Sequence, residues 1–251
     1  MNNPQFTKVV CLECGHEMPP DMTLTVCEKC QSGWLDARYD YDAIKPVWEK
    51  GMTGVRSLWR YGALLPITVP NPEISLGEGY TPLVRLYQYE RIYGHEGIYI
   101  KDERHQPTNS FKDRQAAMSV TAMQQQGVKE CVLASTGNAA VAYAAYCARA
   151  GIKLWLFLTS LVPNEKMREA ALYGAEVVKV SGTYDETKKI AAQFAERKNI
   201  IMDKGARTIP SKESMKTLGY EIAEQLALER HPDGSKKWLA PDWYIQAVSG
   251  G

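Results

Sequence analysis

Two short runs of residues carry types and spacings that could do chemistry. Residues 108–115 offer one lysine, Lys112, behind small polar residues and before a predicted helix, and residues 135–138 offer clustered backbone amides after a strand-like stretch. A lysine near an anion-binding loop suits an enzyme that binds a phosphorylated aldehyde as a Schiff base. Each run also fits an ordinary role when it is read alone, because Lys112 resembles a solvated surface lysine and the loop resembles a helix N-cap with a turn glycine.

The predicted elements around these runs favour the chemical interpretation. Lys112 lies near the start of a predicted helix, where the positive end of the helix dipole disfavours an ammonium group. Residues 135–138 lie in a strand-to-helix turn, and open sheets bind ligands at the carboxyl ends of their strands, where helix N-termini bind anions. Ser249, Gly250 and Gly251 repeat this arrangement after another strand-like run.

Strands and helices alternate along the chain from residue 97 onward. The predicted strands are 97–101, 130–134, 153–158, 176–180, 200–202 and 243–248. The predicted helices are 110–126, 138–150, 163–173, 184–197 and 215–228, with an earlier one over 43–50 before a proline-rich extended stretch at 65–72. Short strands separated by helices predict right-handed β-α-β units on a parallel sheet, so the fold class is α/β.

Four cysteines near the N-terminus form two C-x-x-C pairs. Cys11 and Cys14 are separated by twelve residues from Cys27 and Cys30. Four thiolates arranged in two such knuckles suit a tetrahedral structural Zn²⁺, and they leave no open position for a catalytic ion. The alternatives are two disulfides, disfavoured in a cytoplasmic chain, or replacement of one thiolate by His16. The other two cysteines, at 131 and 147, lie in apolar surroundings and fit a core role.

Composition sets the outer limits of function. The chain has 251 residues, 45% of them hydrophobic and 24% charged, with a formal net charge of +1. This balance gives no sign of a nucleic-acid surface, and no apolar run approaches the roughly 20 residues that a membrane helix needs. The first eight residues lack the apolar core of a signal peptide, so we expect a cytoplasmic protein with no nucleic-acid or membrane partner.

Several motifs together resemble those of a known enzyme family. Residues 106–114 (QPTNSFKDR) resemble the cofactor-lysine motif of threonine synthases, and residues 78–83 (EGYTPL) resemble a stretch that these enzymes carry upstream. Residues 135–138 (STGN) are similar to their asparagine loop, and residues 174–178 (GAEVV) to a later strand entry. The resemblance runs from about residue 76 to the end of the sequence. It is to the threonine synthase-like, fold-type II (tryptophan synthase β-like) pyridoxal-phosphate enzymes, some of which carry a preceding zinc-ribbon-like segment.

The resemblance implies a role for each matching residue. Lys112 would form the Schiff base with pyridoxal 5'-phosphate and then act as the general base that moves protons at Cα and Cβ of the substrate. Asn138 would hydrogen-bond the phenolic oxygen of the cofactor, and Phe111 would help to wall it. The remaining implied ligands are Ser135, Thr136 and Asn138 for the substrate, Gly250 and Gly251 for the cofactor phosphate, and Lys101 as a candidate for a substrate phosphate.

The resemblance also implies the architecture, namely two domains with parallel open sheets preceded by a small zinc ribbon. We expect a zinc-ribbon-like segment over 1–38, a linker and the N-terminal part of the large cofactor domain over 39–114, a smaller α/β domain over 115–205, and the start of the returning large domain over 206–251. The family fold usually continues well past the glycine loop, so we expect the C-terminal part of the catalytic domain to be missing from this sequence.

Two positions depart from the family pattern. Asn109 stands where members usually have glycine, an exchange that asparagine tolerates if the position is left-handed. Ala139 and Ala140 stand where many threonine synthases carry Thr-Ser. This exchange removes a hydroxyl near the expected carboxylate and cofactor site.

The function expected from this resemblance is that of a pyridoxal-phosphate-dependent carbon-oxygen lyase acting on phosphates. It would convert O-phosphohomoserine and water to threonine and phosphate, as a possible homodimer. The alternatives with the same fold are a threonine dehydratase-like ammonia-lyase and a cysteate synthase-like β-replacement enzyme. An alternative of another class is a non-catalytic zinc-ribbon protein whose α/β part binds a metabolite or a partner.

Overall fold

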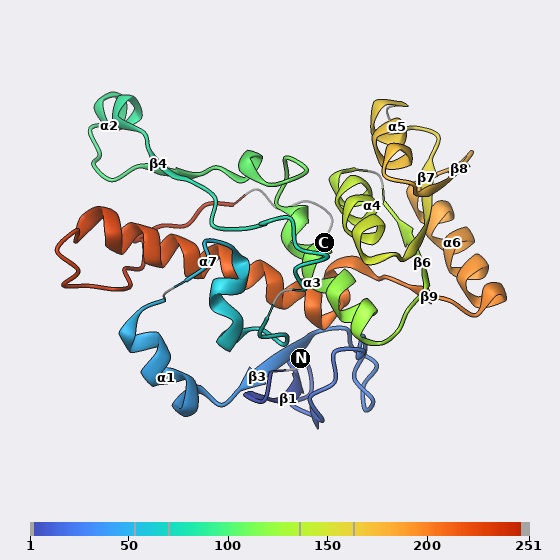
Figure 1. Cartoon of the computed structure of the whole chain (residues 1–251), viewed down its shortest axis with the longest axis horizontal. Coiled ribbons are helices and arrows are strands. Elements are labelled where there is room, and N and C mark those ends of the chain that lie inside the picture. The colour runs from blue at the N-terminus through green and yellow to red at the C-terminus, as the bar shows by residue number, and fades with distance from the viewer. Residues whose placement is uncertain (1–2, 53, 70, 136, 163, 247–251) are drawn as a thin grey trace.

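A computed structural model describes residues 3–52, 54–69, 71–135, 137–162 and 164–246. The chain runs through an N-terminal antiparallel sheet, a projecting arm and an α/β layer, and a long helix lies between these parts (Figure 1). No helix within the described ranges is both long enough and apolar enough to cross a membrane.

The N-terminal part is a three-stranded antiparallel sheet in the order β2–β1–β3. Its strands are β1 (Phe6–Cys11), β2 (Glu17–Met18) and β3 (Leu35–Tyr39). Burial alternates along β3, as expected for a strand with one covered face. Helix α1 (Tyr41–Lys50) follows at once, because the Asp40 side chain accepts a hydrogen bond from the Ala43 amide at 3.0 Å and caps the helix.

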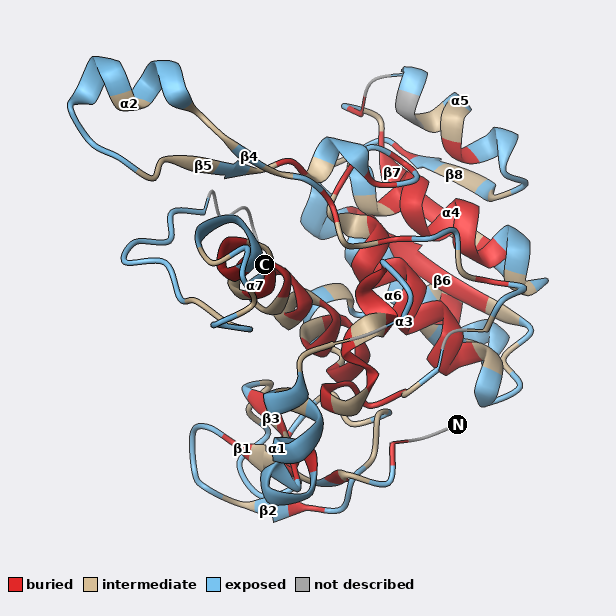
Figure 2. Cartoon of the chain, turned by 60° about the vertical axis from the view of Figure 1, so that its left-hand side comes forward, coloured by how far each residue is buried: buried red, intermediate tan, exposed pale blue. Residues whose placement is uncertain are grey.

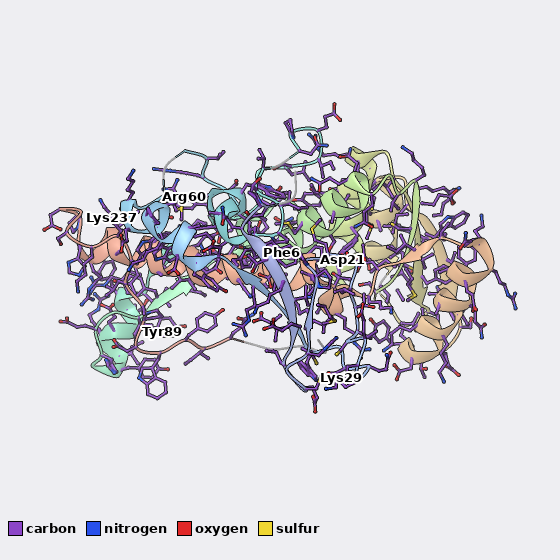
Figure 3. All side chains as sticks on the ribbon, turned by 90° about the horizontal axis from the view of Figure 1, so that it is seen from below. Phe6, Asp21, Lys29, Arg60, Tyr89 and Lys237 are labelled. Atoms are coloured by element: carbon purple, nitrogen blue, oxygen red, sulfur yellow. The ribbon has the colours of Figure 1, made fainter. Side chains whose placement is uncertain are left out.

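The arm is an antiparallel pair of strands joined by a short helix. It consists of β4 (Leu83–Arg85), α2 (Tyr87–Tyr93) and β5 (Tyr99–Lys101). The Glu90 carboxylate accepts the amides of Gly97 and Ile98 at 2.8 and 3.0 Å and so turns the chain back on itself. The arm projects from the body with mostly exposed residues (Figure 2), and Tyr89 of α2 lies far from Lys29 of the loop between β2 and β3 (Figure 3).

The α/β layer contains a four-stranded parallel sheet in the order β8–β7–β6–β9. The strands are β6 (Glu130–Ala134), β7 (Lys153–Thr159), β8 (Glu176–Val180) and β9 (Ile201–Met202). The connecting helices are α4 (Asn138–Ala150), α5 (Asn164–Leu172) and α6 (Tyr184–Lys198).

The two faces of this sheet are covered by different helices. Cys131 and Leu133 belong to the main core, which also contains the buried residues of α4 and of α3 (Lys112–Gln125). Val132 belongs to a second core with Ala191 and Ala195 of α6. Successive residues of β6 therefore point to opposite helical layers, as in a doubly covered parallel sheet.

Helix α7 (Ile209–Arg230) connects the parts of the molecule. It packs against α3, against β3 of the N-terminal sheet and against the 3-10 helix η1 (Leu58–Leu64). The Thr208 side chain caps its N-terminus, and Pro210 lies in its first turn, where a missing amide hydrogen costs nothing. Two further 3-10 helices are η2 (Glu103–His105) and η3 (Gly205–Arg207).

Most of the predicted elements are confirmed, and β6, α4 and β8 have the predicted bounds. Three predictions are wrong. The strand at 97–101 is shorter and pairs antiparallel with β4, because the Glu90 contacts close a hairpin-like turn. Helix α7 begins at Ile209 rather than at 215 because Thr208 caps it. Of the strand predicted over 243–248, residues 247–248 lie outside the described residues. Residues 243–246 form no strand, because no described strand pairs with them and Trp243 and Ile245 are exposed.

Candidate active site

Lys112 is the first residue of α3, and the turn before it is fixed by its own side chains. The Asp113 carboxylate accepts the amide and the hydroxyl of Thr108, each at 2.7 Å. Asn109 has φ +59°, so it adopts the left-handed conformation in which asparagine can stand in place of glycine. The Ser110 hydroxyl accepts the Lys112 amide at 3.3 Å. The sequence from Thr108 to Asp113 thus presents the lysine at a helix N-terminus.

The environment of Lys112 favours a neutral amine. Burial lowers the pKa of Lys112 from the ordinary lysine range. No carboxylate of the described residues forms an ion pair with it, and its Nζ lies 4.6 Å from the centre of the Phe111 ring. Among the described residues, the Lys112 Nζ donates one hydrogen bond, to Gln115 Oε1 at 3.5 Å. An amine that is half-buried and not paired with a carboxylate is suited to nucleophilic chemistry.

The loop from Ser135 to Asn138 joins β6 to α4, as predicted. Ser135 is buried, its amide donates to Phe157 O at 3.2 Å, and its hydroxyl accepts the Gly137 amide at 3.4 Å. Asn138 is the first residue of α4 and is exposed. The loop therefore offers a helix N-terminus at the carboxyl end of a central strand. Thr136, Gly250 and Gly251 lie outside the described residues.

A series of hydrogen-bonded polar side chains, which the sequence did not reveal, joins Lys112 to the interior of the α/β layer. Gln115 Nε2 donates to the Tyr143 hydroxyl at 3.3 Å, and that hydroxyl donates to Asp203 Oδ1 at 3.1 Å. All three side chains are buried. Burial raises the pKa of Asp203 to about 6, against the opposing effect of the hydrogen bonds that it accepts. The position of Asp203 directly after β9, at the carboxyl end of a parallel strand, is the sequence signal that could have identified this group.

Lys101 lies in a buried ion cluster and not in an open site. Its Nζ contacts Glu221 Oε2 at 2.7 Å and donates to Thr81 O at 2.6 Å and to Gln225 Oε1 at 2.8 Å. Burial lowers the pKa of Lys101, and the Glu221 charge opposes this effect. Arg114 is fully buried in the same cluster and pairs with Glu221 and Glu103. As a phosphate ligand, Lys101 would have to give up these contacts.

The four N-terminal cysteines form one cluster, and all four are free thiols. Their sulfur atoms lie within 4.8 Å of one another, with Cys11 3.6 Å from Cys30 and Cys14 3.7 Å from Cys27. These separations are far longer than a disulfide of about 2.05 Å. They match the spacing of about 3.8 Å between sulfurs that bind a tetrahedral ion at about 2.3 Å. Gly15 has φ +71°, as expected in a tight knuckle, and His16 is not part of the cluster.

Burial and hydrogen bonds shift the pKa values of Cys11 and Cys30 in opposite directions. Burial raises the pKa of Cys11, but hydrogen bonds from the amides of Cys14 and Glu13 outweigh it and the pKa falls to about 7. The Ser32 amide lowers the pKa of Cys30, but burial and the neighbouring thiols outweigh it and raise the pKa to about 12. A bound cation would favour the deprotonated form of all four cysteines, because its charge stabilises the four thiolates together.

A cavity of about 400 Å³ lies apart from Lys112. It is enclosed by the loop between the cysteine pairs, by the C-terminal end of α3, and by α6 and β9. Apolar side chains such as Met22, Met123 and Ile201 dominate its lining, and none of the described residues that the sequence predicted for the active site lines it. The candidate active site is therefore the region of Lys112 and the loop after β6, because that region holds the amine and the helix N-terminus.

Comparison with known proteins gives a consistent result. Residues 74–251 match a family model described as pyridoxal-phosphate dependent enzyme. The chain is 36% identical over 217 residues to threonine synthase of Methanosarcina acetivorans, a match covering 86% of this chain and 53% of the relative. It is 34% identical over 241 residues to threonine synthase of Methanocaldococcus jannaschii, covering 95% and 56% respectively. The chain spans about half the length of these curated relatives.

Solved structures support the fold. The crystal structure of Escherichia coli diaminopropionate ammonia lyase in its apo form aligns with a TM-score of 0.57 at 15% identity. The alignment covers 74% of this chain and 56% of that one. At this identity the likeness establishes the α/β architecture and carries nothing about the reaction.

Proposed function

This chain belongs to the pyridoxal-phosphate dependent enzyme family, and from that premise we propose that it acts as a lyase resembling threonine synthase. The proposed reaction converts O-phosphohomoserine and water to threonine and phosphate. The similarity to two threonine synthases supports the choice of reaction. The single observation that carries the proposal is Lys112, a half-buried lysine at a helix N-terminus with a lowered pKa and no ion-pair partner among the described residues.

The residues of this chain are suited to holding pyridoxal phosphate. Lys112 would bond to its aldehyde carbon, and Phe111, whose ring already contacts the Lys112 side chain, would lie against it. Asn138 would reach its phenolic oxygen, and Gly250 and Gly251 would approach its phosphate. When bound, the cofactor supplies an electron sink for negative charge that develops on the substrate.

The chain's own groups would then bind the substrate and move its protons. Ser135, Thr136 and Asn138, with the amides at the start of α4, would hold the substrate carboxylate. Lys112 would carry protons between Cα and Cβ, a task that needs a pKa below the ordinary lysine value. A role for Lys101 toward the substrate phosphate would require its Nζ to leave Glu221 Oε2, which it contacts at 2.7 Å.

We propose in addition that the cysteine cluster holds one structural Zn²⁺. The four sulfurs have the spacing of a tetrahedral site, and a fully thiolate ligand set leaves no position for a substrate. The cytoplasmic location, the homodimer and the domain boundaries at 38, 114 and 205 stay predictions from the sequence.

The experiment that tests the cofactor role is a titration of the chain with pyridoxal phosphate, followed by visible absorbance. We expect a band from lysine-bound cofactor that is lost in Lys112→Ala and kept in Lys189→Ala, a matched control at an exposed lysine of α6. Absence of the band from the wild-type chain would favour the metabolite- or partner-binding alternative.

The reaction is tested separately with the cofactor-loaded protein. Release of phosphate and threonine from O-phosphohomoserine supports the threonine synthase reaction. Release of ammonia from threonine, or β-replacement without either product, supports one of the two alternatives with the same fold.

A further inference from the structure

The hydrogen bonds between Lys112 and Asp203 all run in one direction. Gln115 Oε1 lies 3.5 Å from Lys112 Nζ, Gln115 Nε2 donates to Tyr143 at 3.3 Å, and Tyr143 donates to Asp203 Oδ1 at 3.1 Å. The three side chains come from α3, from α4 and from the residue after β9. They are 3%, 0% and 5% exposed, so these bonds lie almost entirely out of contact with bulk water, although Asp203 also lines the cavity of about 400 Å³.

The direction of these hydrogen bonds is set at the Asp203 end by a backbone amide. The Gly205 amide donates to Asp203 Oδ1 at 2.6 Å, and a backbone N–H cannot reverse its role. When Oδ1 carries no proton, as in the carboxylate, it can only accept, and the Tyr143 hydroxyl uses its only hydrogen toward it. The Tyr143 oxygen can then only accept from Gln115, which must present its NH₂ group to Tyr143.

The same logic decides which atom of Gln115 faces the lysine. With its NH₂ group turned to Tyr143, Gln115 presents its carbonyl oxygen to Lys112. A carbonyl oxygen accepts an N–H of the neutral amine and leaves the nitrogen lone pair free. The reversed amide would instead donate a hydrogen to that lone pair and mask the nucleophile.

We infer that Tyr143 and Asp203 are positioning residues that fix the orientation of the Gln115 amide and so keep the lone pair of Lys112 free to react. The inference rests on the proposed function of Lys112 as the cofactor lysine. The φ of +61° at Gly205 is a backbone conformation that disfavours other residues, and it belongs to the segment that presents this amide to Asp203. Asp203 interacts electrostatically with Tyr143 and Cys147 of α4, and Lys204 lines the same cavity.

The test measures the reactivity of each lysine without cofactor. Trace acetylation over a range of pH, followed by peptide mass spectrometry, gives both the pKa and the intrinsic rate of the neutral amine at each lysine. In Tyr143→Phe the Gln115 amide is free to turn, and we expect the intrinsic rate of Lys112 to fall about three- to tenfold, the equivalent of one ordinary hydrogen bond. Lysines on the exposed face of α6 are internal standards.

A matched variant separates orientation from loss of packing. Tyr146→Phe removes the same hydroxyl from an equally buried tyrosine of α4, but that hydroxyl bonds Glu78 at 2.9 Å and not Gln115. We expect it to leave Lys112 unchanged. Equal losses in Tyr143→Phe and Tyr146→Phe would overturn the inference, as would no loss in either.

A rescue variant covers the case in which Tyr143→Phe disturbs the fold. Gln115→Glu has no NH₂ group, so neither of its orientations can donate to the amine. In the Tyr143→Phe background we expect it to restore the intrinsic rate of Lys112 to within twofold of wild type while raising its pKa. A rate that stays low would show that orientation is not the cause and would refute the inference.

The outcome is distinguishable from failure of the proposed function. If pyridoxal phosphate gives no lysine-bound band in the wild-type chain, the proposed function fails, whatever the acetylation rates are. If the band forms at the same rate in Tyr143→Phe as in wild type and the acetylation rates also agree, the positioning role fails while the cofactor role stands.

Discussion

Glu221→Gln should destabilise this protein strongly, because it unbalances a buried ion cluster. The cluster holds two cations, Lys101 and Arg114, and two anions, Glu103 and Glu221. The side chains of Arg114 and Glu221 are 0% exposed, and those of Lys101 and Glu103 are 9% and 18% exposed. Glu221 contacts both cations, at 2.7 Å to Lys101 Nζ and 2.5 Å to Arg114 Nη1.

The expected magnitude follows from the charge that is left behind. Glutamine keeps the shape of Glu221 but removes its negative charge, so the cluster changes from neutral to a net charge of +1. Leaving one buried charge unbalanced costs about 3–5 kcal/mol, a large part of the roughly 5–15 kcal/mol by which a domain is stable. Adding Lys101→Met removes one cation and restores neutrality. We therefore expect the double variant to be about 1–3 kcal/mol more stable than Glu221→Gln alone.

Urea unfolding followed by circular dichroism measures these differences. The control is Asp185→Asn, which breaks an exposed pair with Lys188 and should change stability by less than about 0.5 kcal/mol. A Glu221→Gln variant within about 1 kcal/mol of wild type would contradict the charge argument. So would a double variant that is less stable than the single one.

Three further predictions concern the metal cluster, a buried acid and a glycine. Cys27→Ser should abolish zinc binding and lower the melting temperature of the zinc-loaded protein, whereas Cys147→Ser should keep the zinc; metal analysis and thermal unfolding check both. Asp203→Asn should stabilise the protein by up to about 3 kcal/mol at pH 7 and by almost nothing at pH 4, as measured by urea unfolding at both values. The sign follows because the folded pKa of about 6 lies above the ordinary aspartate value of 3.8, so the folded state loses stability as pH rises through this window. Gly79→Ala should cost more than about 3 kcal/mol in the same assay, because φ is +88° and the new Cβ would overlap the backbone nitrogen of Leu58.

Local sequence was sufficient for the elements that hold the candidate site. The bounds of β6 and α4 were predicted correctly, because an apolar strand, a turn glycine and an alanine-rich helix follow one another directly. The left-handed Asn109 and the two cysteine knuckles were also readable, since each depends on a few neighbouring residues.

Prediction failed where an element depends on a distant partner. Residues 243–246 have strand-like side chains but form no strand, because a strand needs a neighbour for its backbone hydrogen bonds. Lys101 was predicted as a phosphate ligand because the local sequence shows no partner for it. Its partner, Glu221, lies 120 positions further along the chain.

The sequence by itself determined that this chain has a lysine at a helix N-terminus, a strand-to-helix loop ending in asparagine, and four cysteines spaced for one ion. Those features depend on local turns and on spacing, which neighbouring residues set. Only the tertiary structure decided that Lys101 is neutralised in a buried cluster and that Gln115, Tyr143 and Asp203 meet behind Lys112. These contacts depend on how α3, α4, α7 and the segment after β9 pack together. They also depend on the desolvation that this packing causes. No short stretch of sequence determines either the packing or the desolvation.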